Sequence, residues 1–84
     1  MHHYVFKRQA FKDLKKLPKG IQNRIISKLD YYISVANPLV FADRLINYEI
    51  GQYRFRIGDY RVIFDVEDEI IIILTLGYRK EIYH

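Results

Sequence analysis

"QYRFRIGDYRVIF", from Gln52 to Phe64, has the pattern of two β-strands joined by a tight turn. Aromatic and β-branched residues, which strands favour, lie on both sides of Gly58-Asp59, and such a Gly-containing pair forms two-residue hairpin loops. The stretch therefore predicts an antiparallel hairpin with strands at 53–57 and 60–66.

Strand alternation predicts where the arginines of this hairpin point. Arg54 and Arg56 share one face of the first strand, because successive side chains of a strand point to opposite sides. A two-residue loop pairs Ile57 with Tyr60, and it therefore pairs Arg56 with Arg61. Directly opposed residues project to the same face, so all three arginines are predicted to converge there.

The next turn extends this prediction along the chain. With a polar turn at 67–69 and a last strand at 70–76, pairing Val66 with Ile70 places Arg61 opposite Thr75. Arg79 then has the parity of the arginine side. The other side collects the expected core, which comprises Tyr53, Phe55, Ile57, Tyr60, Val62, Phe64, Val66, Ile72, Leu74 and Leu76.

Arg56 facing Arg61 is unfavourable unless something negative lies near them, since like charges opposed on a sheet destabilise it. Two explanations stay open at this point. Glu49, Asp59 or Asp65 could compensate the charge in ordinary exposed ion pairs. Alternatively, the face binds phosphate, because a planar guanidinium matches phosphate with two hydrogen bonds.

The first half of the chain predicts a strand and two helices that cover this sheet. A β-prone run at 4–6 precedes a helix over 8–17, in which Phe11, Leu14 and Leu17 recur at helical spacing. Pro18 breaks that helix, and a second helix is expected over 19–35. A further strand is expected at 44–50. The predicted class is α+β: an N-terminal strand and a two-helix hairpin on a mainly antiparallel sheet that ends in a four-strand meander.

Length and composition limit what the chain can be. Its 84 residues predict a single domain over 1–84, without cysteine and therefore without disulfides or thiolate chemistry. No apolar run approaches the ~18 residues of a membrane span and no signal peptide opens the chain, so we expect a cytoplasmic protein. No metal-ligand spacing is present, and we expect no cofactor.

Positive charge is concentrated at the N-terminal end. The net charge is +4, and the first 24 residues hold seven basic side chains against Asp13 alone. At helical spacing, five of them form one stripe: Arg8, Lys12, Lys15, Lys16 and Lys19. Such a stripe favours nucleic acid or an acidic protein partner, although a solvated helix face gives the same pattern.

Two C-terminal motifs carry a family resemblance. "YRFRIGDYRVIFDVEDEIIIILTLGYRKEIY", residues 53–83, resembles the C-terminal half of the RelE/ParE superfamily of type II toxin–antitoxin toxins. Its marks are the R-x-G-D-Y-R-V-I-F hairpin and the closing G-Y-R-K-E-I-Y, a variant of the usual G-H-R-x-x-I/V-Y. "FKRQAFKDLKKLP", residues 6–18, is similar to the opening strand and helix of the family.

The resemblance implies a RelE-like fold and, for the RelE branch, a ribosome-dependent endoribonuclease that cuts mRNA in the A site. Arg54 and Arg56 fall where that branch has lysines, and Arg61, Arg79 and Tyr83 match its arginines and closing tyrosine. These five residues are the expected catalytic set, and the basic stripe is expected to bind RNA. The implied partners are a cognate antitoxin, the ribosome and mRNA.

The resemblance leaves the chemistry open. Arginine at both lysine positions cannot act as a general base, because its guanidinium does not deprotonate in proteins. Tyr83 could exchange a proton or stack on a base. One alternative is a ParE-like protein that poisons DNA gyrase by binding, without nuclease chemistry. Another is a non-toxic module that only binds its partner.

Overall fold

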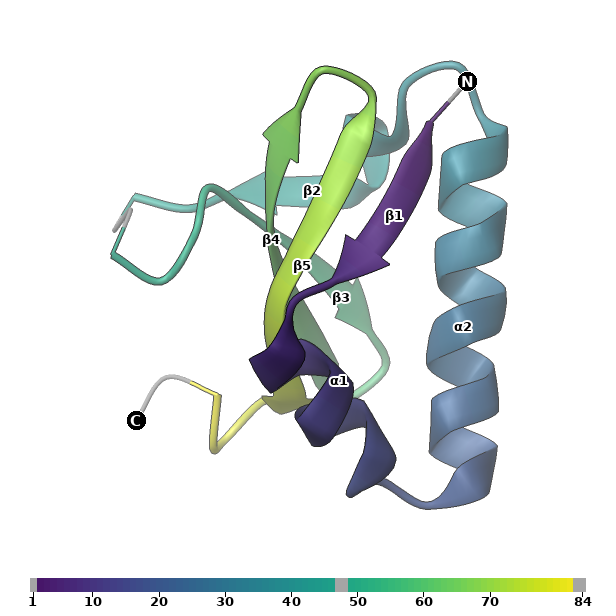
Figure 1. The fold of residues 1–84 in the computed structure, drawn as a ribbon, viewed down its shortest axis with the longest axis vertical. Helices are drawn as coiled ribbons and strands as arrows, with labels where there is room; N and C mark the ends of the chain where they lie inside the picture. The colour runs from purple at the N-terminus through teal and green to yellow at the C-terminus, as the bar shows by residue number, and fades with distance from the viewer. Residues whose placement is uncertain (1, 47–48, 83–84) are drawn as a thin grey trace.

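The computed structural model describes residues 2–46 and 49–82, which form two α-helices, a short 3-10 helix and five strands (Figure 1). Their order is β1 (His3–Phe6), α1 (Arg8–Lys15), α2 (Lys19–Ser34), η1 (Pro38–Phe41), β2 (Ala42–Arg44), β3 (Tyr53–Ile57), β4 (Tyr60–Glu67) and β5 (Ile70–Tyr78). The predicted α+β class is confirmed.

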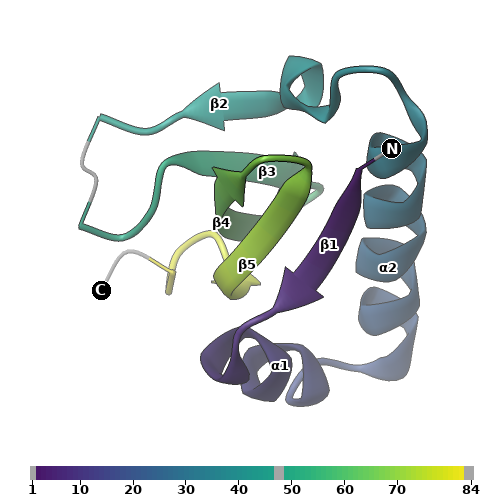
Figure 2. The ribbon, with the colours of Figure 1, turned by 45° about the horizontal axis from the view of Figure 1, so that its top comes forward.

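The strands form one mixed sheet in the order β1-β5-β4-β3-β2. The last four make the predicted antiparallel meander, whereas β1 lies at the far edge and pairs with β5 in parallel. A parallel neighbour needs a crossover connection. Here the helices, η1 and three strands separate β1 from β5 in sequence, and α2 lies beside β1 (Figure 2).

Both helices pack on one face of the sheet and enclose the core. An aromatic stack runs through it, with ring centroids 4.6 Å apart between Tyr32 and Phe55 and 4.3 Å apart between Phe55 and Phe64. The other buried members are Ala10, Leu14, Ile25, Leu29, Ile57, Val62, Ile71, Ile73 and Leu76. None of the helices in the described ranges is long and apolar enough to cross a membrane.

The buried side of α1 differs from the predicted one. Phe11 is 52% exposed and its ring lies under the Lys15 ammonium group, while Ala10 is fully buried beside Leu14. The short side chain of Ala10 lets the helix approach the sheet closely. Helical spacing alone could not distinguish the Ala10–Leu14 side from the Phe11–Leu14 side.

The strand predicted at 44–50 is wrong in its bounds, because β2 ends at Arg44; residues 47 and 48 of that prediction lie outside the described residues. Gly51 is buried with a φ of 151°. A Cβ there would lie 2.6 Å from Ile63 Cγ2, so only glycine lets the chain approach this close. Gly51 thereby covers Ile63 on the face opposite the helices.

The predicted register between β4 and β5 is also wrong. Val66 pairs with Ile71 instead of Ile70. A bulge between Ile63 and Phe64 then shifts the register again, so that Ile63 lies opposite Thr75 and Arg61 opposite Gly77. Because a shift of one residue exchanges the two faces of a strand, Ile71 and Ile73 join the core in place of Ile72 and Leu74. The second shift, at the bulge, returns the odd-numbered residues at the end of β5 to the sheet face of Arg61, as predicted.

Candidate functional site

The β3–β4 hairpin has the predicted register. Arg56 pairs with Arg61 and Arg54 with Ile63, so the three arginines lie on the sheet face away from the helices. Arg79 follows β5 directly and has the same parity. We call the surface formed by Arg54, Arg56, Arg61 and Arg79 the arginine face.

Asp43, which the sequence analysis did not identify, lies between two of these arginines. It pairs with Arg54 across β2 and β3. Its Oδ2 atom accepts hydrogen bonds from Arg54 Nε at 3.2 Å and Arg54 Nη2 at 2.9 Å, and lies 2.8 Å from Arg56 Nε. One carboxylate oxygen thus contacts two guanidinium groups. Asp43 belongs to a strand of three residues, too short to give a sequence signal of its own.

These contacts lower the pKa of the Asp43 carboxyl, mainly through the hydrogen bond from Arg54 and further through the charge of Arg56. The contacts of Asp43 with Arg54 and Arg56 therefore stabilise the fold at pH values above the ordinary aspartate pKa of about 3.9. This contribution is lost as the pH falls through the lower pKa of Asp43 in the folded chain.

Replacing Arg54 with glutamine is expected to raise the Asp43 pKa towards its ordinary value, because the main hydrogen-bond donor and one charge are lost. A titration of the Asp43 side-chain carboxyl by ¹³C NMR measures this directly in both proteins. Asp30, which lies on α2 away from the arginine face, serves as the internal reference. Identical Asp43 titrations in the two proteins would show that Arg54 does not set this pKa.

Arg61 has a different environment from Arg54 and Arg56. Its Nη1 donates to the carbonyl oxygens of Gly58 at 2.8 Å and Tyr60 at 2.9 Å, which are neutral acceptors. Within residues 2–46 and 49–82, no carboxylate lies at ion-pair distance from it. No carboxylate of the described residues therefore compensates the positive charge of Arg61 opposite Arg56.

Arg79 is fixed to the β3–β4 turn by its backbone. Its N–H donates to the Asp59 carbonyl oxygen at 2.8 Å, and its Nε lies 3.7 Å from Asp59 Oδ1. Of the acidic residues considered from sequence, Asp59 thus lies beside Arg79, while the Asp65 carboxylate accepts the Gln52 N–H. Among residues 2–46 and 49–82, ion pairs of the arginine face involve Asp43 and Asp59.

The chain after Arg79 turns back beside β5. The N–H groups of Glu81 and Ile82 donate to the Tyr78 carbonyl oxygen. The Ile82 side chain lies over Gly77, and a Cβ atom added to Gly77 would be 3.7 Å from Ile82 Cδ1. Gly77 in turn pairs with Arg61. The predicted catalytic residue Tyr83 lies outside the described residues.

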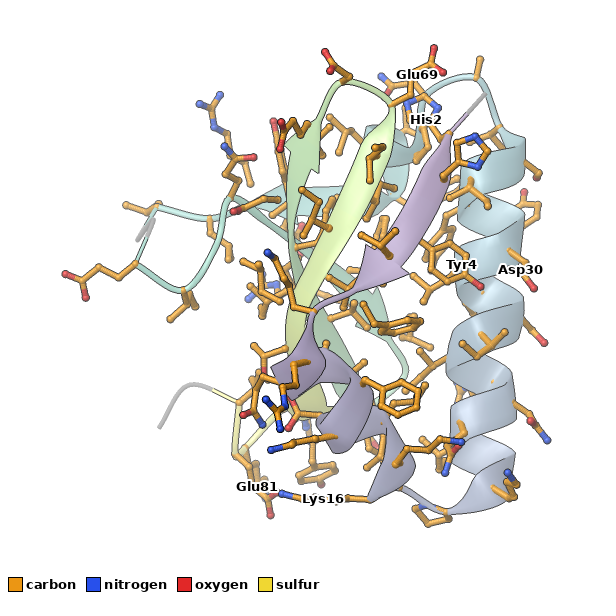
Figure 3. All side chains as sticks on the ribbon, in the orientation of Figure 1. His2, Tyr4, Lys16, Asp30, Glu69 and Glu81 are labelled. Atoms are coloured by element: carbon orange, nitrogen blue, oxygen red, sulfur yellow. The ribbon has the colours of Figure 1, made fainter. Side chains whose placement is uncertain are left out.

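A hollow of about 540 Å³ lies between α1, the end of β5 and this turn. Lys16 and Glu81 border it from opposite sides (Figure 3), and Asp13 forms part of its wall. The Asp13 carboxylate accepts hydrogen bonds from Thr75 Oγ1 at 2.6 Å and from the Leu76 N–H at 3.2 Å. Because two carboxylates line the hollow, the arginine face is the better candidate for binding an anion.

The predicted basic stripe is exposed but is divided between two helices. Arg8, Lys12 and Lys15 belong to α1, Lys16 follows it, and Lys19 begins α2. In the described part of the chain, no three His, Asp or Glu side chains are grouped as metal ligands.

Comparisons with known proteins identify the family to which the chain belongs. The sequence model described as "ParE toxin of type II toxin-antitoxin system, parDE" matches residues 4–83. The archaeal RelE–RelB complex from Pyrococcus horikoshii OT3 contains a chain 32% identical to this one, with a TM-score of 0.71 over 95% of this chain and 97% of that one. A search of curated proteins gave no match.

Two further solved structures are similar. The RelBE2 toxin–antitoxin complex from Mycobacterium tuberculosis matches at 25% identity and a TM-score of 0.76, over 93% of this chain and 98% of that one. The RelB–RelE complex from Methanococcus jannaschii matches at 28% identity and a TM-score of 0.72, over 94% of both chains. The chain therefore belongs to the ParE toxin family, within the RelE/ParE superfamily of type II toxin–antitoxin toxins.

Proposed function

We propose that this toxin is a ribosome-dependent endoribonuclease that cleaves mRNA in the A site and so inhibits translation. The observation that carries the proposal is the direct opposition of Arg56 and Arg61, with Arg79 on the same face. Opposed like charges cost stability, and the charge of Arg61 has no carboxylate partner among the described residues. A phosphate group bound between these side chains relieves that repulsion.

RNA cleavage through the 2′-hydroxyl produces a pentacovalent phosphate with extra negative charge. Arg61 and Arg79 are assigned to stabilise this charge, and Arg54 and Arg56 to hold the adjoining backbone. Tyr83 is assigned to exchange a proton with the reacting oxygens. None of the four guanidinium groups acts as a general base. Catalysis therefore relies on charge stabilisation and on the positioning that the ribosome provides.

The exposed basic stripe has a separate part in this proposal. Arg8, Lys12, Lys15, Lys16 and Lys19 are assigned to ribosomal RNA, since lysine and arginine contacts to phosphates give affinity without sequence preference.

A cognate antitoxin is the second proposed partner. The similar RelE chains from Pyrococcus horikoshii and Methanococcus jannaschii were solved in complex with RelB. By analogy, we expect an antitoxin whose acidic side chains cover the arginine face and exclude RNA from it. A small open reading frame beside the toxin gene, encoding an acidic chain, is the expected source.

Primer extension on mRNA from cells that express the toxin tests the nuclease proposal. We expect discrete cuts within translated codons, and their loss when the start codon of the reporter message is removed. Untranslated RNA in the same cells is the internal control. Intact transcripts together with gyrase-dependent DNA damage would instead support the ParE-like mode of action.

A further inference from the structure

The contacts of Asp43 are those expected of an anion held by the arginine face. Its Oδ2 atom has three guanidinium nitrogens within 3.2 Å: Nε and Nη2 of Arg54, and Nε of Arg56. Phosphate oxygens bind guanidinium groups with the same short, charge-assisted hydrogen bonds. A phosphate oxygen that bound both arginines would therefore need the position of this carboxylate oxygen.

We propose that Asp43 is an internal competitor for phosphate: its carboxylate occupies the anion site between Arg54 and Arg56 in the free toxin and leaves it when RNA binds. The RNA part of this proposal rests on the proposed function. The competition itself concerns any phosphate group and holds whether or not the toxin cleaves RNA.

The position of Asp43 suits a group that has to leave. β2 has three residues and lies at the edge of the sheet, so β3 is its only neighbour among the described strands. The Asp43 side chain is 43% exposed and that of Arg56 is 61% exposed, so both have room to rotate into solvent. Arg54 is 20% exposed and stays with the sheet.

The size of the effect follows from this exposure. Solvent-exposed ion pairs contribute modestly, so displacement of Asp43 weakens phosphate binding without preventing it. Removing its charge is expected to strengthen phosphate binding about two- to fivefold. The slope of log affinity against log salt concentration is expected to steepen by about one, because the freed guanidinium groups contact phosphate.

Asp43→Asn is the decisive variant, because asparagine keeps the shape and one oxygen but loses the charge. The probes are inorganic phosphate and a 2′-O-methyl RNA trinucleotide, which lacks the nucleophile for cleavage, titrated into the full chain by calorimetry. Glu67→Gln is the matched control: it makes the same change in net charge at the exposed far end of β4. We expect tighter binding of both probes to D43N and less than a twofold change for E67Q.

A second measurement on the unmodified protein keeps the proposal testable if D43N does not fold. When phosphate is added, the Nε–Hε NMR signals of Arg54 and Arg56 are expected to shift together with the Asp43 carboxyl signal. Shifts confined to Arg61 and Arg79 would overturn the proposal, as would D43N affinities equal to or below those of E67Q. If D43N binds phosphate more tightly but the unmodified toxin cuts no mRNA in cells, the nuclease assignment alone is overturned.

Discussion

Replacing Arg61 or Arg79 with alanine is expected to slow mRNA cleavage by about 10²–10³-fold and to abolish growth arrest, because in the proposed mechanism each side chain is a donor that stabilises charge in the transition state. The fold should persist. Arg61 donates to the carbonyl oxygens of the β3–β4 turn, and its loss also removes the repulsion with Arg56. Arg79 is fixed mainly through its backbone N–H, which alanine retains.

Cleavage rates on programmed ribosomes, with circular dichroism melts of the same preparations, measure this prediction. Arg44→Ala is the matched control, since Arg44 is an exposed arginine on the neighbouring strand with the opposite parity to Asp43. It should keep nearly full activity. If R61A and R79A stay as toxic as R44A, the catalytic assignment is wrong.

Replacing Phe55 with alanine is expected to lower the free energy of unfolding by about 3–5 kcal/mol. Phe55 is fully buried, stacks on Phe64 of β4 and packs against the tilted ring of Tyr32 of α2, so its removal leaves a cavity between helix and sheet. A chain of this length has a total stability of roughly 4–13 kcal/mol. The loss is therefore a large part of it, and it affects the strand that carries Arg54 and Arg56.

Urea unfolding followed by circular dichroism gives this value, and Phe11→Ala supplies the comparison. Phe11 is half exposed and contacts the Lys15 ammonium group, so its loss should cost about 1 kcal/mol at most. Similar losses in the two variants would show that the stack is not the main support of β3.

The hairpin could be predicted from sequence because its signals are local. Alternation in 53–57 and a two-residue turn at Gly58-Asp59 determine that Arg56 meets Arg61, and the structure has that pairing. The arginine face depends on the hairpin and on the parity of Arg79, which the bulge beyond Phe64 happened to leave unchanged.

The errors concern contacts between distant parts of the chain. Asp43 meets Arg54 only because β2 pairs with β3, and a strand of three residues carries too few side chains to show alternation. The bulge inserts one residue into an apolar run, Ile70 to Leu74, in which every register places an apolar side chain in the core. Such a run does not specify its own register.

The parallel pairing of β1 with β5 has a consequence for how the chain folds during its synthesis. The ribosome makes the chain from its N-terminus, so residues 3–6 have no partner strand until residues 70–73 have been synthesised. The Gly77–Arg61 pair and the Arg79–Asp59 backbone contact form later still. A nascent chain therefore lacks the complete arginine face until Arg79 has been synthesised and β5 has paired with β4.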